Sequence, residues 1–306
     1  MKDPCVSVCL ITYNQAPYIT GAIEGILAQK TDFPFELVIG EDGSTDGTAQ
    51  ICREYAKKFP DLIRLFCRSR EDVVYIEGYP TSRNNLLKTF RACRAEFIAY
   101  CEGDDYWQDE RKLKKQVDFL KTRPEYGMVH TVADVFYQSK NRLKKYKGGY
   151  HPAEGDVYKN LFYRYNIFSS SVCCRAELLR RGLDELEKFG SKWISGDIVL
   201  WLTVAYNSKV HYMDQPMIVY RIIDGSLSHQ DDLVRIFKFR RSLYRTYRHF
   251  LKKSGAGVSR RWLFLRFLRS CRVDMLKAAE HYFTKRLYRL PFFGRRYKNC
   301  LCGAHK

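Results

Sequence analysis

One apolar segment of the chain leads directly into a cluster of acidic side chains. Residues 97–100 read Phe-Ile-Ala-Tyr, which is typical of a buried strand, and Glu102, Asp104 and Asp105 follow within four positions. Carboxylates this close repel one another, and one of them tends to keep its proton unless a cation lies between them. Mg²⁺ takes oxygen ligands and binds carboxylates together with substrate phosphates. We therefore expect a ligand site here; the alternative is an acidic turn that caps the next helix.

Strand-like and helix-like segments alternate along the first part of the chain. The predicted strands are 5–11, 35–40, 62–67 and 97–100, and the predicted helices between them are 18–30, 49–59 and 84–93. This order predicts a parallel sheet with helices on its faces. Glu41 and Asp42 follow the second strand, so they and the acidic cluster should open onto the same edge of the sheet. Neither loop carries the glycine-rich phosphate motif of a dehydrogenase or a P-loop enzyme.

A third carboxylate stands out further along the chain. Asp197 follows Gly196 and opens an apolar helix predicted over 198–206. Backbone N–H groups and the helix dipole favour a charged carboxylate at that place, which suits a functional residue. An ordinary N-cap is the alternative. The surrounding elements are predicted as a helix over 110–121, strands over 126–137, 166–174 and 209–221, and a basic, aperiodic loop near the site over 141–150.

The net charge of +19 is confined to the C-terminal part of the chain. Residues 233–306 contain 21 Lys and Arg against two acidic residues, so 32 basic and 32 acidic residues remain in 1–232. The 11 cysteines form no paired Cys-x-x-Cys pattern, which disfavours zinc and disulfide scaffolds and indicates a reducing compartment. A strand pattern begins by residue 5 and no apolar run reaches the length of a membrane span. We therefore expect neither a signal peptide nor a transmembrane helix.

The basic C-terminal region is predicted to form two helices, over 233–253 and 260–287, on either side of a Ser-Gly-Ala-Gly break. Fourteen aromatic side chains are interleaved with its Lys and Arg residues. Such helices suit the interface of an anionic membrane. The alternative is a helix pair that packs on the rest of the protein with a solvated basic face, and we expect a share of both. Nucleic acid is a weaker candidate partner because no nucleic-acid-binding motif is present.

Taken together, these motifs resemble the family 2 glycosyltransferases of bacterial surface-polysaccharide synthesis, which have the GT-A fold. The resemblance covers residues 1–230, leaving 231–306 as a basic, aromatic-rich helical extension. It implies an α/β domain with a mostly parallel central sheet flanked by helices. The matching positions are Thr12-Tyr13-Asn14, Glu41-Asp42-Gly43-Ser44-Thr45-Asp46, Asn85, Glu102-Gly103-Asp104-Asp105-Tyr106-Trp107, Lys112-Leu113, Gln116 and Gly196-Asp197.

The resemblance also implies a role for individual positions. Asp104 is expected to bind the metal, Mg²⁺ or Mn²⁺, and Asp197 to be the catalytic base. Glu102 stands at the first acidic place of the family's Asp-x-Asp-type signature. The expected nucleotide-sugar-binding residues are Thr12, Asn14, Glu41, Asp42, Asn85, Glu102, Asp104, Asp105 and Trp107.

We therefore expect a metal-dependent glycosyltransferase that moves a sugar from a nucleotide-diphosphate sugar to a hydroxyl of a glycan or lipid-linked acceptor. A UDP-linked donor and inversion at the anomeric carbon are expected, the latter because only Asp197 is placed to act as a single base. The resemblance and the basic C-terminal region place this work in cell-surface polysaccharide synthesis, at the inner face of the cell membrane, with the protein cytoplasmic and peripheral.

Two other function classes stay open at this point. A sugar-phosphate nucleotidyltransferase shares the general sheet architecture, but it should carry a glycine-rich loop with Arg and Lys after the first strand, and residues 12–18 are not such a loop. A non-catalytic protein that binds membranes or nucleic acid on a decayed GT-A scaffold is the other. The joint presence of Asp42, Asp104, Asp105 and Asp197 argues against it. The sequence identifies neither the donor sugar, the acceptor nor the oligomeric state.

Overall fold

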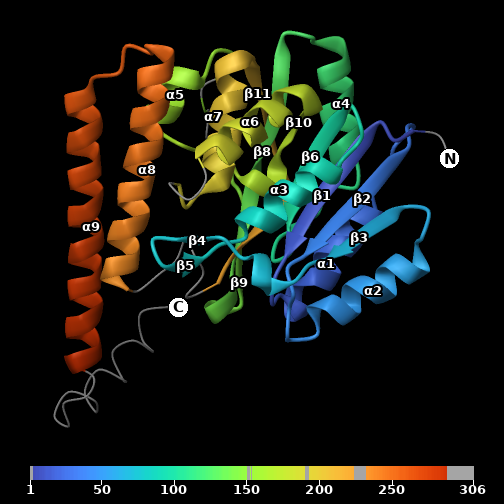
Figure 1. Cartoon of the computed structure of the whole chain (residues 1–306), viewed down its shortest axis with the longest axis horizontal. Coiled ribbons are helices and arrows are strands. Elements are labelled where there is room, and N and C mark those ends of the chain that lie inside the picture. Colours follow the sequence, from blue (N-terminus) through green and yellow to red (C-terminus); the bar gives the residue numbers. More distant parts are fainter. Residues whose placement is uncertain (1–2, 150–151, 153, 190–192, 224–231, 288–306) are drawn as a thin grey trace.

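The computed structural model describes residues 3–149, 152, 154–189, 193–223 and 232–287. Within these residues nine strands form one sheet in the order β3-β2-β1-β6-β10-β8-β11-β7, with β9 paired to β8 (Figure 1). The strands are β1 Val6–Thr12, β2 Phe35–Glu41, β3 Ile63–Cys67, β6 Phe97–Glu102, β7 Tyr106–Trp107, β8 Tyr126–Tyr137, β9 Arg142–Lys144, β10 Cys173–Arg175 and β11 Lys209–Ile222. A separate hairpin pairs β4, Tyr75–Ile76, with β5, Tyr79–Pro80.

The first half of the sheet is parallel, as the alternation of strands and helices predicts. β3, β2, β1 and β6 all run in the same direction. Their register aligns the carboxyl ends, since Thr12 pairs with Glu41 and Ile11 pairs with Glu102. The loops after β1, β2 and β6 therefore open on one edge of the sheet, which is where α/β proteins hold their ligands.

The second half of the sheet is mixed. β10 runs antiparallel to both β6 and β8, while β8 and β11 are parallel to each other. The strand predicted over 166–174 is wrong for most of its length, because only Cys173–Arg175 pairs as β10. Ser169–Ser171 forms a single 3₁₀ turn, η3, in which Ser171 Oγ donates to the Phe168 carbonyl at 2.7 Å. Local side-chain bonds of this kind compete with strand pairing.

Helices cover both faces of the sheet, with a hydrophobic core on each face. Because side chains alternate along a strand, successive residues contact opposite cores. Val6, Val8 and Leu10 of β1 belong to one core, and Cys9 and Ile11 belong to the other. The first core is closed by α1 Ala16–Leu27, α2 Thr48–Lys58 and α4 Lys112–Thr122. The second is closed by α3 Arg83–Ala92, α5 Tyr158–Tyr163, α6 Ala176–Phe189 and α7 Gly196–Asn207.

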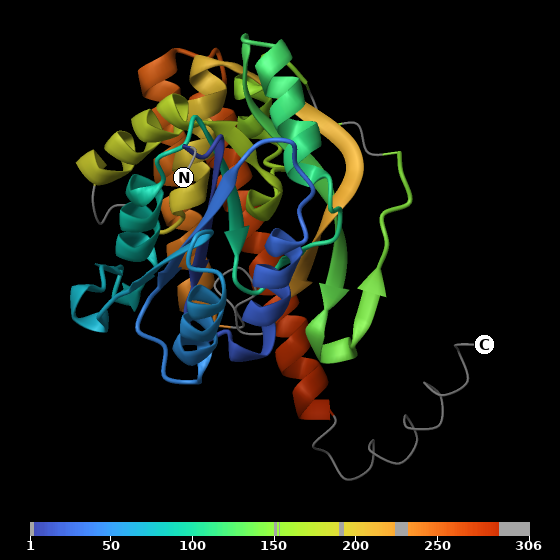
Figure 2. The same cartoon turned by 90° about the vertical axis from the view of Figure 1, so that its right-hand side faces the viewer.

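The C-terminal region forms two long helices, α8 Leu233–Ser254 and α9 Arg260–Leu287, as predicted. They lie side by side and antiparallel, since Phe237 contacts Phe267 and Tyr244 contacts Phe264, and α9 is the outermost element (Figures 1 and 2). α8 joins the second core, in which its Phe250 is buried. The boundary predicted near residue 230 lies outside the described residues, as do residues 288–306, so the division into two domains stays a prediction.

None of the helices in the described part of the chain has both the length and the hydrophobicity that a membrane span requires. α8 and α9 are long enough, with 22 and 28 residues, but Lys and Arg residues interrupt their apolar side chains. The basic side chains of the C-terminal region thus lie on two helices, α8 and α9, that pack on the protein. Neither helix is an apolar segment of the membrane-spanning kind.

Gly40 of β2 provides a test of how α3 docks on the sheet. A Cβ atom at this position would lie 2.0 Å from Thr89 Oγ1 and 2.4 Å from Asn85 Oδ1. Gly40→Ala should therefore lower the free energy of unfolding by about 2 kcal/mol, because it overpacks a well-filled contact. Urea unfolding measures the change, with Gly21→Ala in α1 as the control.

Gly21 has no neighbour within 4 Å of the added methyl group, so the control should gain about 0.5–1 kcal/mol of stability from helix propensity. Equal stability of the two variants would contradict the close approach of α3 to β2.

Candidate active site

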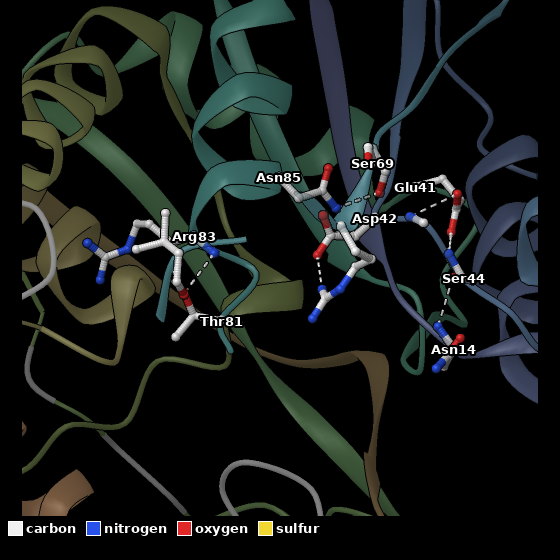
Figure 3. Close-up of polar contacts among 12 residues, drawn as sticks. Asn14, Glu41, Asp42, Ser44, Ser69, Thr81, Arg83 and Asn85 are labelled. Carbon is white, nitrogen blue, oxygen red and sulfur yellow. Dashed lines mark hydrogen bonds and ion pairs between the residues drawn. The ribbon is translucent and has the colours of Figure 1, made fainter. Parts of the chain in front are cut away.

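The loop after β2 is folded by its own carboxylate. Glu41 accepts hydrogen bonds from the backbone N–H groups of Gly43 at 3.2 Å and Ser44 at 2.7 Å. Asn14 lies opposite in the left-handed region, with φ of +49°, and its Oδ1 accepts from Thr45 N at 2.9 Å. Asn14 N in turn donates to Ser44 Oγ at 2.9 Å (Figure 3). The loops after β1 and β2 are therefore joined into one rigid rim.

Asp42 on this rim is buried and paired with a cation. Arg70 Nη1 lies 2.6 Å from Asp42 Oδ2, and the guanidinium lies 4.0 Å from the centre of the Tyr13 ring. Burial raises the pKa of Asp42, and the charge of Arg70 opposes that rise. A carboxylate, a planar cation and an aromatic ring thus stand together beside Glu41 and Asn14.

Thr12 connects this rim to the acidic turn. Thr12 Oγ1 donates to Gln15 Oε1 at 2.8 Å. Both atoms lie against Gly103, where a Cβ atom would be 2.7 Å from Thr12 Oγ1 and 2.5 Å from Gln15 Oε1. Gly103 is needed here because its missing side chain lets the turn between Glu102 and Asp104 approach β1.

The acidic turn gathers three carboxylates. Glu102, Asp104 and Asp105 each place one carboxylate oxygen within 4.8 Å of the others. Burial raises the pKa of all three, most clearly for Glu102, and the neighbouring acids raise the pKa of Glu102 and Asp105 further. For Asp105 the pKa rises to about 8. The cluster favours either retained protons or a bound cation.

The protein's own donors hold two of these residues in place. Asp105 accepts from Ser170 Oγ at 2.6 Å and from Arg221 N at 2.8 Å, one bond on each carboxylate oxygen. Arg221 Nε donates to the Asp104 carbonyl at 2.8 Å. Asp105 therefore supports the turn, whereas the carboxylates of Glu102 and Asp104 are better placed to ligate a cation. Oxygen donors of this kind fit Mg²⁺ or Mn²⁺.

Asp197 stands in the first turn of α7 and does not cap it. The N-cap residue is Ser195, and no side chain bonds to the helix end. Asp197 Oδ2 instead accepts from Ser169 Oγ at 2.9 Å, and Oδ1 accepts from Ser195 Oγ. Trp201 Nε1 donates to the same Ser169 Oγ at 3.1 Å. The N-cap alternative is thus wrong, and the carboxylate is oriented by hydroxyl groups instead.

A cavity of about 750 Å³ brings Asp197 and the acidic turn together. Glu102, Asp105 and Asp197 all line it. Its wall also contains basic and aromatic side chains from four other segments, including Lys144, Lys145, Tyr146, Arg164, Tyr165, Phe168, Tyr220 and Phe239. The basic loop predicted near the site over 141–150 does reach it. A volume of this size is typical of a site for a small-molecule ligand.

Two of the predicted nucleotide-sugar-binding residues lie beneath the site. Asn85 is buried, and its Nδ2 donates to the Gly40 carbonyl at 2.8 Å (Figure 3). Trp107 is buried as well; its Nε1 donates to the Ser170 carbonyl at 2.9 Å, and Lys112 Nζ lies 4.0 Å from the centre of its ring. Both side chains support the surrounding loops, and direct contact of either with a nucleotide stays a prediction.

The predicted site residues thus lie in two groups. Asn14, Glu41 and Asp42 lie on the rim after β2, and Glu102, Asp105 and Asp197 lie on the cavity, with Thr12 and Asp104 between them. Sequence reasoning missed the residues that hold these groups, notably Arg70, Ser169, Ser170, Arg221 and Phe239. Serines carry no distinctive sequence signal, and the partners of Arg221 in the acidic turn lie more than a hundred positions earlier in the chain.

The chain matches the model of a known protein family. The model described as "Glycosyl transferase family 2" matches residues 7–185, which is more than half of the chain. The chain belongs to glycosyl transferase family 2. The family that the motifs predicted is therefore confirmed. Glu102 and Asp105 of the cavity lie within the matched residues, whereas Asp197 lies beyond them.

Curated relatives agree with this assignment. An uncharacterized protein of Mycobacterium bovis is 40% identical over 133 residues, and the match covers 44% of this chain but only 36% of that protein. The putative teichuronic acid biosynthesis glycosyltransferase TuaG of Bacillus subtilis is 25% identical over 229 residues, covering 74% of this family 2 chain and 82% of TuaG.

Solved structures show the same fold. TarS of S. aureus in complex with UDP-GlcNAc superposes with a TM-score of 0.57 at 16% identity, covering 87% of this chain and 72% of TarS. The mannosyltransferase PcManGT of Pyrobaculum calidifontis in complex with GDP-Man and Mn²⁺ gives a TM-score of 0.55 at 16% identity, covering 92% and 76%. The predicted GT-A fold with a C-terminal helical part is thus confirmed.

Binding of a divalent cation to the acidic turn is expected to release protons. The pKa values of Glu102, Asp104 and Asp105 are all raised, that of Asp105 to about 8, so the cation-free cluster holds protons near neutral pH and a cation must displace them. The affinity for Mn²⁺ should therefore be higher at pH 8 than at pH 6. Calorimetry in two buffers of different ionisation enthalpy counts the released protons. An affinity that is the same at both pH values, without proton release, would contradict the raised pKa values.

Proposed function

We propose that the chain is a metal-dependent glycosyltransferase that moves a sugar from a nucleotide-diphosphate sugar to a hydroxyl group of a glycan or lipid-linked acceptor. The observation that carries the proposal is the single cavity faced by both Asp197 and the acidic turn. A transferase of this type needs a carboxylate for the attacking hydroxyl on one side of the reacting sugar. It also needs a place for the charged leaving group on the other side.

The donor nucleotide is assigned to the rim after β2. Asp42 and Asn14 offer carboxylate and amide oxygens to a base or ribose, and Tyr13 offers an aromatic face. Since Arg70 contacts both Asp42 and Tyr13, it would have to move or share this place when a base binds. A UDP-linked donor is our proposal, supported by the solved complex of TarS with UDP-GlcNAc; the complex of PcManGT with GDP-Man keeps GDP in the test.

The donor's diphosphate is assigned to the acidic turn, with Asp104 and Glu102 as the cation ligands. When bound, Mg²⁺ or Mn²⁺ would neutralise the charge that develops on the departing nucleoside diphosphate. Asp105 keeps the turn folded through its two hydrogen bonds, and Arg221 holds the Asp104 carbonyl. The fold thus holds the oxygen ligands close together before a cation binds, although the carboxylates repel one another.

Asp197 is proposed as the catalytic base. With Ser169 and Ser195 each donating to one of its oxygens, the carboxylate keeps a fixed orientation and a lone pair toward the cavity it lines. It would take the proton from the acceptor hydroxyl as that oxygen attacks the anomeric carbon, a contribution of about 10²–10⁴-fold. One base and one displacement invert the anomeric configuration.

The biological setting is proposed to be cell-surface polysaccharide synthesis at the cytoplasmic face of the membrane. The relative TuaG is named for teichuronic acid biosynthesis, which supports an acceptor of the cell-surface glycan type. α9 supports a peripheral membrane contact, because its Phe264, Leu265 and Leu268 are 45%, 52% and 46% exposed. Exposed arginines accompany them on the same helix, namely Arg261, Arg269 and Arg272. Exposed apolar and basic side chains together suit an anionic lipid surface.

A pair of variants tests the proposed site. Wild type should bind one of UDP, GDP or CDP in the presence of Mn²⁺ and lose that binding in EDTA. Asp104→Ala should remove the metal-dependent part, because it deletes the proposed cation ligand. Asp197→Asn should keep nucleotide affinity within about twofold but lower transfer by about 10²-fold or more. Calorimetry measures the binding, and nucleotide release from the matching nucleotide sugar measures the transfer.

The two variants serve as controls for each other, since each removes one carboxylate of the proposed active site. Lost nucleotide affinity in Asp197→Asn would assign that residue to binding instead of proton transfer. Failure of folded wild type to bind any of the nucleotides would refute the glycosyltransferase proposal as a whole.

The membrane contact has a test of its own. Replacing Leu265 and Leu268 together by Ser should weaken partitioning onto phosphatidylglycerol vesicles by about tenfold or more, since burying each Leu contributes about 1.5–3 kcal/mol. Raising the salt concentration should weaken wild-type binding too, by screening the arginines. Tyr206→Ser, which replaces an exposed aromatic side chain at 44%, is the control and should bind as wild type. Vesicle binding that neither salt nor the double variant changes would rule out α9 as the contact.

A further inference from the structure

The 3₁₀ turn η3 touches both chemical centres of the cavity through neighbouring serines. Ser169 Oγ donates to Asp197 Oδ2 at 2.9 Å. The next residue, Ser170, donates through Oγ to Asp105 Oδ2 at 2.6 Å, and the same oxygen accepts from Glu102 N at 3.1 Å. Adjacent positions of one turn therefore hold the carboxylate proposed as the base and the turn proposed to bind the cation.

η3 is itself fixed by the core beneath it. Gln116 Nε2 donates to the Ser171 carbonyl at 2.8 Å, and Trp107 Nε1 donates to the Ser170 carbonyl at 2.9 Å. Ser171 Oγ accepts from Thr131 N of β8 at 3.1 Å. Ser170 and Ser171 are almost completely buried, with 2% and 0% exposure. The turn is thus a rigid element of the core rather than a surface loop.

The direction of the Ser169 hydroxyl follows from its two partners. The indole N–H of Trp201 can only donate, and it reaches Ser169 Oγ at 3.1 Å. The serine oxygen therefore accepts that bond, which leaves its own proton for Asp197. Ser195 donates to the other oxygen of Asp197. The carboxylate has one hydroxyl donor on each oxygen, so its plane is fixed from two sides.

We propose that η3 is the positioning element of the active site. Ser169 orients Asp197, Ser170 orients the acidic turn, and their adjacency sets the distance between the two. The inference rests on the proposed function, in which Asp197 is the base and the acidic turn binds the cation. Within that function it assigns separate roles to two neighbouring serines, and these roles can be measured separately.

Alanine variants of the full chain test this assignment. Ser170→Ala should weaken the Mn²⁺-dependent binding of UDP or GDP, whichever wild type binds, by about tenfold, because the acidic turn loses a hydrogen bond to a charged group. Ser169→Ala should leave that affinity and the donor KM within about twofold but lower kcat by about tenfold or more. The rate is followed as nucleotide release with water as the acceptor, and crystals of Ser169→Ala should show Asp197 turned from its wild-type position.

Matched variants separate positioning from misfolding. Ser169→Thr keeps the hydroxyl and should recover most of the lost rate. Ser270→Ala removes a hydroxyl that donates to the Phe267 carbonyl within α9, so it should match wild type in every assay. The proposal is overturned if Ser169→Ala keeps both its rate and the Asp197 position, or if Ser170→Ala binds Mn²⁺ as wild type does. Equal loss of nucleotide affinity in both serine variants would overturn it as well.

Failure of the proposed function would look different. If Asp197→Asn keeps the full rate, Asp197 is not the base, yet the Ser169→Ala crystals and the Mn²⁺ affinity of Ser170→Ala still decide whether η3 positions the two groups.

Discussion

The repulsion among three clustered carboxylates is the constraint on which the rest of the structure depends. Glu102, Asp104 and Asp105 lie within 4.8 Å of one another, and burial makes their charged forms costly. Such a cluster persists only where the fold supplies donors from several directions. Here Ser170 and Arg221 supply them, to the Asp105 carboxylate and the Asp104 carbonyl, and the Ile11 carbonyl of β1 accepts a hydrogen bond from Gly103 N. Segments from both halves of the sheet, β1 on one side and η3 and β11 on the other, thus hold this four-residue turn.

Both of these donors come from the mixed half of the sheet. The parallel strands β1, β2 and β6 bring acidic loops to one edge, as any doubly wound sheet can. They contribute neither Ser170 nor Arg221. η3, which precedes β10, carries Ser170, and β11 carries Arg221. The antiparallel pairing of β10 with β6 places η3 against the acidic turn. The parallel half presents the carboxylates, and the mixed half orients them.

Much of the fold could be predicted from local patterns, whereas the site's support could not. The apolar run of β1 and the helical spacing of the apolar residues in α8 identify these elements, because the pattern of burial is encoded within each element. η3 was mispredicted as strand since Ser169–Ser171 stand in an apolar segment and reveal their turn only through contacts with Asp197, Asp105 and Thr131. Those partners lie 28 to 65 positions away, and no local pattern records them.

The C-terminal helices are not a separate attachment to this arrangement. Ser242 of α8 accepts a hydrogen bond from Ile194 N at 2.8 Å, and the ring of Trp193 lies 5.1 Å from that of His249, so α8 holds the segment that leads into Asp197. Phe239 of the same helix lines the cavity. Because α9 packs on α8, a membrane bound by α9 would lie at a fixed orientation to the cavity. Removing both helices would therefore disturb the base as well as the membrane contact, and only substitutions on the outer face of α9 can separate the two.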